Sequence, residues 1–438
     1  MVEFTVVHNK NGVSQWLRLC FISIFAFGLS GVAIAGTIKQ TIDLPWVLGQ
    51  TLLNNPNLKT FPYEQRVIEA QQLQAGIRPN PRVSMSLENV LGTGAMSALS
   101  SAETNLALSQ LIEMGDKRQR RIEVAEFELR QLNSEFELTR LDVLSEAANR
   151  YYQLLRLQAL EEWNQRRIEI ERNALATIEK RANAGAIARA DVSKMALRVA
   201  RSEAVGLRLG GELRVAQRRL AAMWGSEGDF SQVEGQLSEF PQLPEAADVL
   251  NAIETAPSFV RLLDLERLSH TKVRLAQANA NSDITVGMGI RRNEALDDTG
   301  LTFNFSIPLA LTNPNEGNIL AAKAEQDKVL EQQRLARSEL RLSLLEIHQG
   351  MSNNLSQGQR LSQQILPIAK QLLKDTESAY RIGQANVLQL VDAQNELFAI
   401  ERELIEAKAA TYLQLLELER ITGQSMTKTE LSSVQETL

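Results

Sequence analysis

The sequence predicts a mainly α-helical protein with a small β part, and three observations lead to this fold class. Aromatic residues make up 5% of the 438 positions and prolines number only 11, while Ala, Leu, Glu, Gln and Arg are abundant. Between Gly115 and Gly185 the chain contains neither glycine nor proline, which favours one very long helix. Four short segments alternate apolar and small polar residues, which is typical of strands.

Residues 1–35 are expected to be a secretory signal peptide. Lys10 and Arg18 carry positive charge, Leu19–Val32 is an uncharged and mostly apolar run, and Ala33–Ala35 offers a small-x-small cleavage site. A membrane anchor is the alternative interpretation. The apolar run of 14 residues is shorter than the roughly 20 residues that cross a bilayer, which favours the signal peptide.

Cys20 is the only cysteine of the chain and lies within this segment. Lipid attachment is one interpretation, but Arg18 and Leu19 stand where such a site has small residues, so we interpret Cys20 as part of the apolar run. The chain after cleavage would contain no cysteine. This excludes disulfides, thiolate metal ligands and a cysteine nucleophile.

The rest of the sequence is an internal duplication. Landmarks recur in the same order at offsets of 197 to 202 residues: Asn55–Leu58 with Ala256–Phe259, Val83–Met85 with Ile284–Val286, Ser109 with Ser306, Gly115 with Gly317, Gly185 with Gly383, and Gly225 with Gly423. We expect a first structural repeat over 36–225, a connector over 226–245, a second repeat over 246–423 and a tail over 424–438. Each repeat is expected to hold a helix, two strands, a long helix, a tip turn and a medium helix.

Each repeat contains one helix long enough to form a rod. In residues 116–183 apolar side chains recur at alternating steps of three and four, which is coiled-coil spacing. Such a helix would extend about 100 Å at ~1.5 Å per residue. The second rod covers residues 317–382, where Pro367 is expected to kink or interrupt the helix. No single globular core accommodates such rods, so they are expected to pack along one another.

Shorter helices are expected beside the rods. The ranges 43–78 and 246–279 precede the strands, and 190–224 follows the first rod. Stacked end to end, the helices over 43–78 and 190–224 would contain 71 residues, which is nearly the length of a rod. One continuous helix can therefore lie beside two stacked ones in a wall of uniform height.

The four predicted strands have one apolar and one small or polar face. The alternation is seen in residues 83–88 and recurs in 105–109, 284–289 and 302–307. Such strands suit a barrel wall between lipid and a wet lumen, and half-buried hairpins of a soluble protein are the alternative. Four strands cannot close a barrel around a pore, and an open sheet edge is not tolerated in lipid. Several copies must therefore pool their strands, and three copies would supply twelve.

In their order along the chain, these features resemble the TolC family of outer-membrane efflux proteins. The resemblance covers about residues 40–425 and is carried by Leu48–Leu58, which ends in Asn-Pro-Asn-Leu, and by Arg78–Pro81 before the first strand. It implies a TolC-like trimer, with four strands per chain in a shared twelve-stranded transmembrane β-barrel and a long periplasmic α-helical coiled-coil barrel. It also implies a Gram-negative outer-membrane location with a periplasmic extension. The implied partners are a periplasmic adaptor (membrane fusion) protein, an inner-membrane RND-type transporter and outer-membrane lipid.

Three stretches resemble most the outer-membrane subunits of cobalt–zinc–cadmium type heavy-metal efflux pumps. They are Arg78–Pro81 with Leu87–Asn89, Leu108–Gln110 with Glu113–Arg118, and Ser306–Leu309 with Asn315–Ile319. Two positions depart from that pattern. Asp116 stands where a second glycine is usual, and Leu311-Thr312 replaces an aromatic-plus-acid pair. These departures leave the family expectation unchanged and weaken the expectation of a metal substrate.

The sequence offers no site for catalysis, a metal or a cofactor. Beyond residue 35 the histidines are His270 and His348, which lie in different predicted helices without a ligand at i+3 or i+4, whereas a zinc or copper site needs several converging ligands. Nucleophile–base motifs and phosphate-binding glycine loops are absent. The net charge of −6 without a basic tract indicates that nucleic acid is not a partner. We therefore expect a protein that is not an enzyme.

The turns that follow the two rods are the candidate functional site. Gly185 and Gly383 can adopt the left-handed backbone that reverses a helix. The resemblance implies that these turns form a periplasmic tip, which closes like an iris and meets the adaptor. It places Asp191, Tyr380 and Asp392 at the closed aperture.

Ala385 departs from the family, because some members have an arginine there. Arg189 or Arg381 is a candidate substitute. A helix cap is the alternative role for Asp191, and one carboxylate can serve both roles. The expected tip and gate residues are Gly185, Arg189, Asp191, Tyr380, Arg381, Gly383 and Asp392.

The expected function is passive conduction, as the outer-membrane exit duct of a tripartite efflux pump, with heavy-metal cations as a candidate substrate. A type I secretion exit duct has the same fold and a polypeptide cargo. A soluble periplasmic coiled-coil adaptor is an alternative of another class, in which the strands would not lie in lipid.

Overall fold

The computed structural model describes residues 40–426, except residues 91, 97, 98, 229, 238 and 310–313. The expected signal peptide over 1–35, residues 311–312 and most of the expected tail over 424–438 lie outside the described residues.

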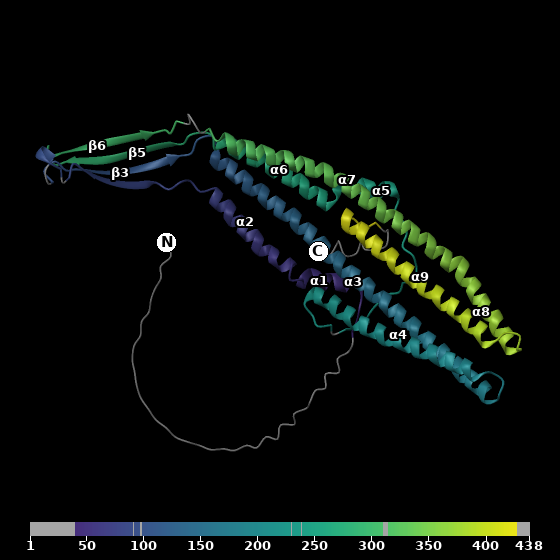
Figure 1. Ribbon diagram of the computed structural model, residues 1–438. Coiled ribbons are helices and arrows are strands. Elements are labelled where there is room, and N and C mark those ends of the chain that lie inside the picture. Colours follow the sequence, from purple (N-terminus) through teal and green to yellow (C-terminus); the bar gives the residue numbers. More distant parts are fainter. Residues whose placement is uncertain are drawn as a thin grey trace, which may run out of the picture. The chain divides into compact units, whose positions relative to one another are not determined.

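Two hairpins form one four-stranded antiparallel sheet. Strands β2 (Arg82–Glu88) and β3 (Glu103–Ile112) come from the first half of the chain, and β5 (Ile284–Asn293) and β6 (Asp298–Ser306) from the second. The order is β2-β3-β5-β6, so β3 and β5 join the two halves and β2 and β6 are the edges. Figure 1 shows these strands beyond one end of the long helices. The four strands predicted from the alternation are confirmed.

The register places apolar side chains of all four strands on one face. Val83 pairs with Leu108, Leu108 with Met288, and Met288 with Phe303, so one apolar row crosses the whole sheet. These side chains are well exposed, from 49% for Leu108 to 76% for Phe303. In the adjacent row, on the other face, a serine, a glycine and an asparagine follow one another across β3, β5 and β6. This two-faced sheet is the arrangement expected of a wall between lipid and water.

The first rod is the continuous helix α3 (Lys117–Asn183), as predicted. The second consists of α7 (Glu316–Arg360), the π-helical turn η5 (Leu361–Ile365) and α8 (Leu366–Arg381). The π turn ends two residues before Pro367, which cannot donate a hydrogen bond to the carbonyl four residues earlier. The turn uses a bond of longer reach, from the Leu366 N–H to the Leu361 carbonyl. The predicted interruption at Pro367 is confirmed.

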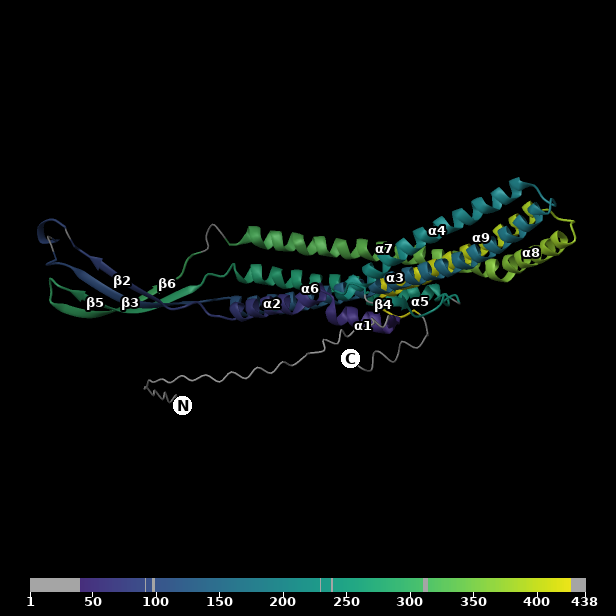
Figure 2. The same cartoon turned by 90° about the horizontal axis from the view of Figure 1, so that it is seen from below.

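Two further helices run back along the rods. Helix α4 (Arg189–Ala221), extended by the 3-10 turn η3 (Ala222–Trp224), packs on α3, and α9 (Val387–Thr422) packs on α3, α7 and α8. Figure 2 shows the two resulting hairpins side by side, with their turns at the same end. Within the described ranges, none of the helices combines the length and apolar character needed to cross a bilayer.

The helices predicted over 43–78 and 246–279 are each broken, which corrects the expectation of single helices. The first consists of α1 (Leu44–Asn54), η1 (Leu58–Thr60) and α2 (Phe61–Ala75), and the second of α5 (Ala246–Asn251), η4 (Ala252–Thr255) and α6 (Pro257–Ala278). Both breaks fall directly before a proline. Asn55 and Ala256 have extended ψ values of 128° and 129°, because a following proline disfavours helical geometry.

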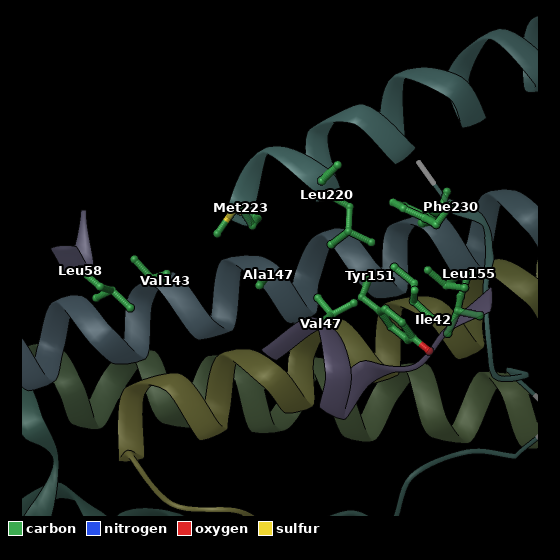
Figure 3. Close-up of a cluster of buried hydrophobic side chains, with 13 residues drawn as sticks. Ile42, Val47, Leu58, Val143, Ala147, Tyr151, Leu155, Leu220, Met223 and Phe230 are labelled. Atoms are coloured by element: carbon green, nitrogen blue, oxygen red, sulfur yellow. The ribbon is translucent and has the colours of Figure 1, made fainter. Parts of the chain in front are cut away.

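The connector contains a strand that the sequence analysis did not predict. Strand β4 (Phe230–Val233) pairs in parallel with β1 (Gln40–Ile42). Gln158 of α3 satisfies the free edge of β4, since its amide donates to the Val233 carbonyl and accepts from the Val233 N–H. Figure 3 shows the core beneath these strands, where side chains of α1, α3, η3 and α4 converge with Ile42 and Phe230. This core fixes the connector to the middle of α3.

Left-handed residues mark both junctions between the sheet and the rods. Asp116 has φ 58° and Asn315 has φ 62°, directly before α3 and α7. Ion pairs hold the first junction: Arg121 with Glu113, and the Lys117 ammonium 2.7 Å from Asp283. Hydrogen bonding from the Arg121 guanidinium lowers the pKa of Glu113 below its ordinary value. The positive φ of Asp116 explains why glycine is usual at this position, and aspartate also tolerates this backbone angle.

Replacement of Asp116 tests this backbone requirement. Asp116→Val should lower the free energy of unfolding by about 1–2 kcal/mol, because a β-branched residue is strained at positive φ. Asp116→Gly should cause no loss. Thermal unfolding followed by far-UV circular dichroism compares the two variants. Equal melting temperatures for both would contradict a left-handed residue at this position.

Candidate functional site

The two tip turns have the same backbone design. Gly185 and Gly383 have φ values of 76° and 79°. In each turn the residue after the glycine donates to a carbonyl five positions earlier: Ala186 to Arg181 and Gln384 to Ala379, both at 2.9 Å. This bonding terminates a helix through a left-handed residue. A side chain at either glycine would have space, so the backbone angle alone favours glycine.

The helices that leave the two turns begin differently. Asn386 caps α9, and its side chain forms a reciprocal capping box with Gln389. Helix α4 begins after Ala188 without a side-chain cap. The alternative that Asp191 caps α4 through a hydrogen bond is therefore wrong, although its carboxylate lies in the first turn, where the helix dipole favours negative charge.

Tyr380 joins the two hairpins instead of standing free in solvent. Its side chain is 8% exposed and lies in a cluster with Ile178, Met195, Val387 and Val391. The guanidinium carbon of Arg181 lies 4.4 Å from the centre of the Tyr380 ring. The Tyr380 hydroxyl is buried without a hydrogen-bond partner among the described residues. Arg181 was not among the site residues predicted from the sequence.

The charged candidates do not pair within one chain. Asp191 is half-buried and Asp392 is exposed, and among the described residues neither forms an ion pair with Arg189 or Arg381. The Arg381 guanidinium lies 4.0 Å from Glu377 of its own helix.

A buried charge cluster lies about two turns from the tip cluster along α3 and was not anticipated. Glu171 of α3 is 1% exposed, accepts a hydrogen bond of 2.9 Å from Arg167 and lies 3.9 Å from the Arg198 guanidinium of α4. Arg198 also donates to the Val391 carbonyl of α9. Burial lowers the pKa of Arg198, and the Glu171 carboxylate opposes this change. In the sequence, Arg167 and Glu171 look like an ordinary surface pair at i,i+4 spacing.

Metal ligation finds no support in the described residues, which contain no group of three or more His, Cys, Asp or Glu side chains able to hold an ion. The imidazole of His348 is engaged elsewhere, since its Nε2 lies 2.9 Å from the Pro244 carbonyl oxygen.

A sheet with one exposed apolar face and two open edges, continued by long helical hairpins, is the architecture of a membrane channel protein. The chain belongs to the outer membrane efflux protein family, whose sequence model matches residues 47–226 and 263–424. It is therefore an outer-membrane exit duct for efflux and lies in the outer membrane of a Gram-negative bacterium, with its helices in the periplasm. This assignment excludes the alternative of a soluble adaptor.

Individual relatives agree with the family. The cobalt-zinc-cadmium resistance protein CzcC of Cupriavidus metallidurans is 25% identical over 373 residues, which are 85% of this chain and 87% of that protein. The outer membrane protein VceC of Vibrio cholerae superposes with a TM-score of 0.71 at 18% identity, covering 87% of this chain and 96% of that one. The open state of the Neisseria gonorrhoeae MtrE channel gives a TM-score of 0.66 at 16% identity, over 88% and 90% of the two chains. The TolC-like fold is thus confirmed.

Proposed function

We propose that three copies of this chain form the passive exit duct of a tripartite efflux pump. The observation that carries this proposal is the pair of open edges, β2 and β6, on a sheet whose outward face is apolar. Unpaired backbone groups are not tolerated in lipid, so β2 of one copy must pair with β6 of the next. Three copies of four strands give a closed barrel of twelve. The duplication into repeats over 36–225 and 246–423 makes each copy contribute two similar hairpins.

The helices carry matching unpartnered apolar faces. One group of exposed apolar side chains lies on α2 and α4: Tyr63, Val67, Leu73, Leu197, Leu207 and Val215. A second group lies on α7 and α8: Leu320, Leu335, Leu342, Ile368 and Leu372. In a ring, α2 and α4 of one copy would face α7 and α8 of its neighbour. A head-to-tail contact of this kind closes into a ring when the rotation per copy is a third of a turn.

Light scattering of the detergent-purified protein tests the assembly. We expect the mass of three chains after correction for bound detergent, because fewer copies leave strand edges unpaired. A monomer that retains the full helical signal in circular dichroism would contradict the proposal.

The transported substrate is proposed from the relatives. The resistance named for CzcC concerns cobalt, zinc and cadmium, and we propose divalent metal cations as the substrate here. A duct needs neither catalysis nor a bound cofactor, and the energy would come from an inner-membrane RND-type transporter joined through a periplasmic adaptor. A type I secretion duct shares the fold. Metal accumulation in a deletion strain, compared with secretion of a reporter polypeptide, separates the two substrates.

The tip turns are proposed as the gate. Three copies would bring three Asp191 and three Asp392 carboxylates near one axis, where they attract cations, while Arg189 and Arg381 of neighbouring copies are available to pair with some of them. Among the described residues, neither arginine pairs with Asp191 or Asp392 of its own chain, which is consistent with a role between copies.

Conductance in planar bilayers tests this gate. Replacing both Asp191 and Asp392 by alanine should lower the cation-to-anion permeability ratio by about twofold or more and weaken block by trivalent cations, because a ring of carboxylates is removed. Arg381→Ala should raise the open fraction. Asp375→Ala, on the exposed face of α8 away from the turn, is the matched control and should change neither quantity. Unchanged selectivity and block in the double variant would place the aperture elsewhere.

A further inference from the structure

The connector is attached to the second rod close to the point where that rod is interrupted. The Pro244 carbonyl oxygen lies 2.9 Å from Nε2 of His348. Leu243 packs on the cluster that contains Leu344 and Met351. Four residues before Pro244, the ring of Phe240 lies against α7. From Phe240 to Pro244 the connector thus runs antiparallel to α7 and away from the π turn.

Phe240 occupies the space that a side chain on α7 would need. The ring carbon Cζ of Phe240 would lie 2.1 Å from a Cβ atom at Gly358, and Cε1 would lie 2.4 Å from it. No side chain larger than hydrogen fits beside the ring. From α9, the Lys408 ammonium lies 5.7 Å from the centre of the same ring. Phe240 is therefore held between α7 and α9, at the last turn of α7 before η5.

The packing face of the rod changes at this place. Leu344, Met351 and Gly358 are buried at steps of seven, which is the repeat of a packed helix. The next step of seven would bury Ile365, yet Ile365 is 37% exposed, and the buried residues that follow Gly358 are Leu361 and Ala369. The π turn inserts the extra backbone that causes this change, and such turns are sites where helices bend.

We propose that Phe240 is a wedge that sets the angle between α7 and α8, and thereby positions the second tip turn. The connector, which is fixed to the middle of α3 by strand β4 and its core, would transmit its own position to the tip through this ring. An effect of Phe240 on transport rests on the proposed gate. Its effect on the bend between α7 and α8 does not, because that bend lies within a single chain.

The test measures the bend directly. Spin labels are introduced by Glu162→Cys on α3 and Gln384→Cys in the second turn, in a Cys20→Ser background, and labelled chains are diluted with unlabelled ones in lipid nanodiscs so that only distances within one chain are seen. Phe240→Ala should shift or broaden the distance distribution by about 2 Å or more, as expected when a helix moves at a released contact. Gly358→Ala should do the same, because its methyl group displaces the ring. In the double variant, the distance shift should be smaller than the sum of the two single shifts, because both substitutions remove the same contact.

Two controls keep the outcome specific. Leu237→Ala removes an apolar side chain from the same connector, in a groove beside Leu155 of α3 and Ile405, and should leave the distribution unchanged. Phe240→Leu retains bulk and should give a smaller shift, which also covers the case that Phe240→Ala fails to fold. Unchanged distributions in Phe240→Ala, Phe240→Leu and Gly358→Ala would overturn the wedge. Failure of the proposed channel would instead appear as loss of the trimer or of conductance in the wild-type protein.

Discussion

Arginine in place of Phe303 is expected to abolish insertion of the channel into the outer membrane. Phe303 is 76% exposed on the apolar face of the edge strand β6, where it pairs with Met288 of β5. A charged side chain on the lipid face costs about 2–4 kcal/mol near the bilayer midplane, and three copies multiply that cost. Phe303→Arg should therefore lose nearly all protein from the outer-membrane fraction.

The neighbouring residue provides the matched control. Asn304 pairs with Gly287 on the opposite, polar face, so Asn304→Arg adds the same charge toward water. We expect a normal amount of Asn304→Arg protein in the membrane. Quantitative immunoblotting of density-separated membranes makes the comparison. Equal amounts of the two variants would show that the apolar face is not in lipid.

Removal of the Glu171 carboxylate is expected to destabilise the helical hairpins strongly. Glu171→Ala leaves the guanidinium groups of Arg167 and Arg198 without their partner between α3, α4 and α9. Breaking a buried pair costs about 3–5 kcal/mol, and we expect the lower end because the two arginines are 23% and 20% exposed. Thermal unfolding followed by far-UV circular dichroism should show a clear fall in the melting temperature.

An exposed ion pair between the same two helices serves as the control. Arg172 of α3 contacts Glu203 of α4 at 2.5 Å, with side chains 62% and 42% exposed. Glu203→Ala should change stability by no more than about 1 kcal/mol, because solvent screens such pairs. A Glu171→Ala variant as stable as Glu203→Ala would show that the Glu171 cluster contributes no net stability.

Elements set by local periodicity were predictable from the sequence. The rod over 116–183 and the four strands carry patterns that extend over many residues, and a strand slipped by one position would turn its apolar face inward. The interruption at Pro367 was also predictable, because proline lacks an N–H, but its form as a π turn that packs against α9 was not.

Elements set by distant contacts were not predictable in the same way. Asn55, at the break after α1, donates to the Met223 carbonyl, and β1 pairs with β4 across nearly two hundred residues. The burial of Tyr380 likewise depends on Met195 and Ile178 of the other hairpin. The two breaks in the shorter helices did have a local signal, since Pro56 and Pro257 restrict the residues before them.

The two unlike edges of the sheet have a genetic consequence. Each copy presents one β2 edge and one β6 edge, so a copy with a damaged edge still pairs through the other and enters the ring. In the proposed ring of three, the fraction of fully intact channels falls as the cube of the wild-type fraction. Alleles that damage one edge should therefore be dominant when co-expressed with the normal gene, whereas alleles that prevent folding altogether should be recessive.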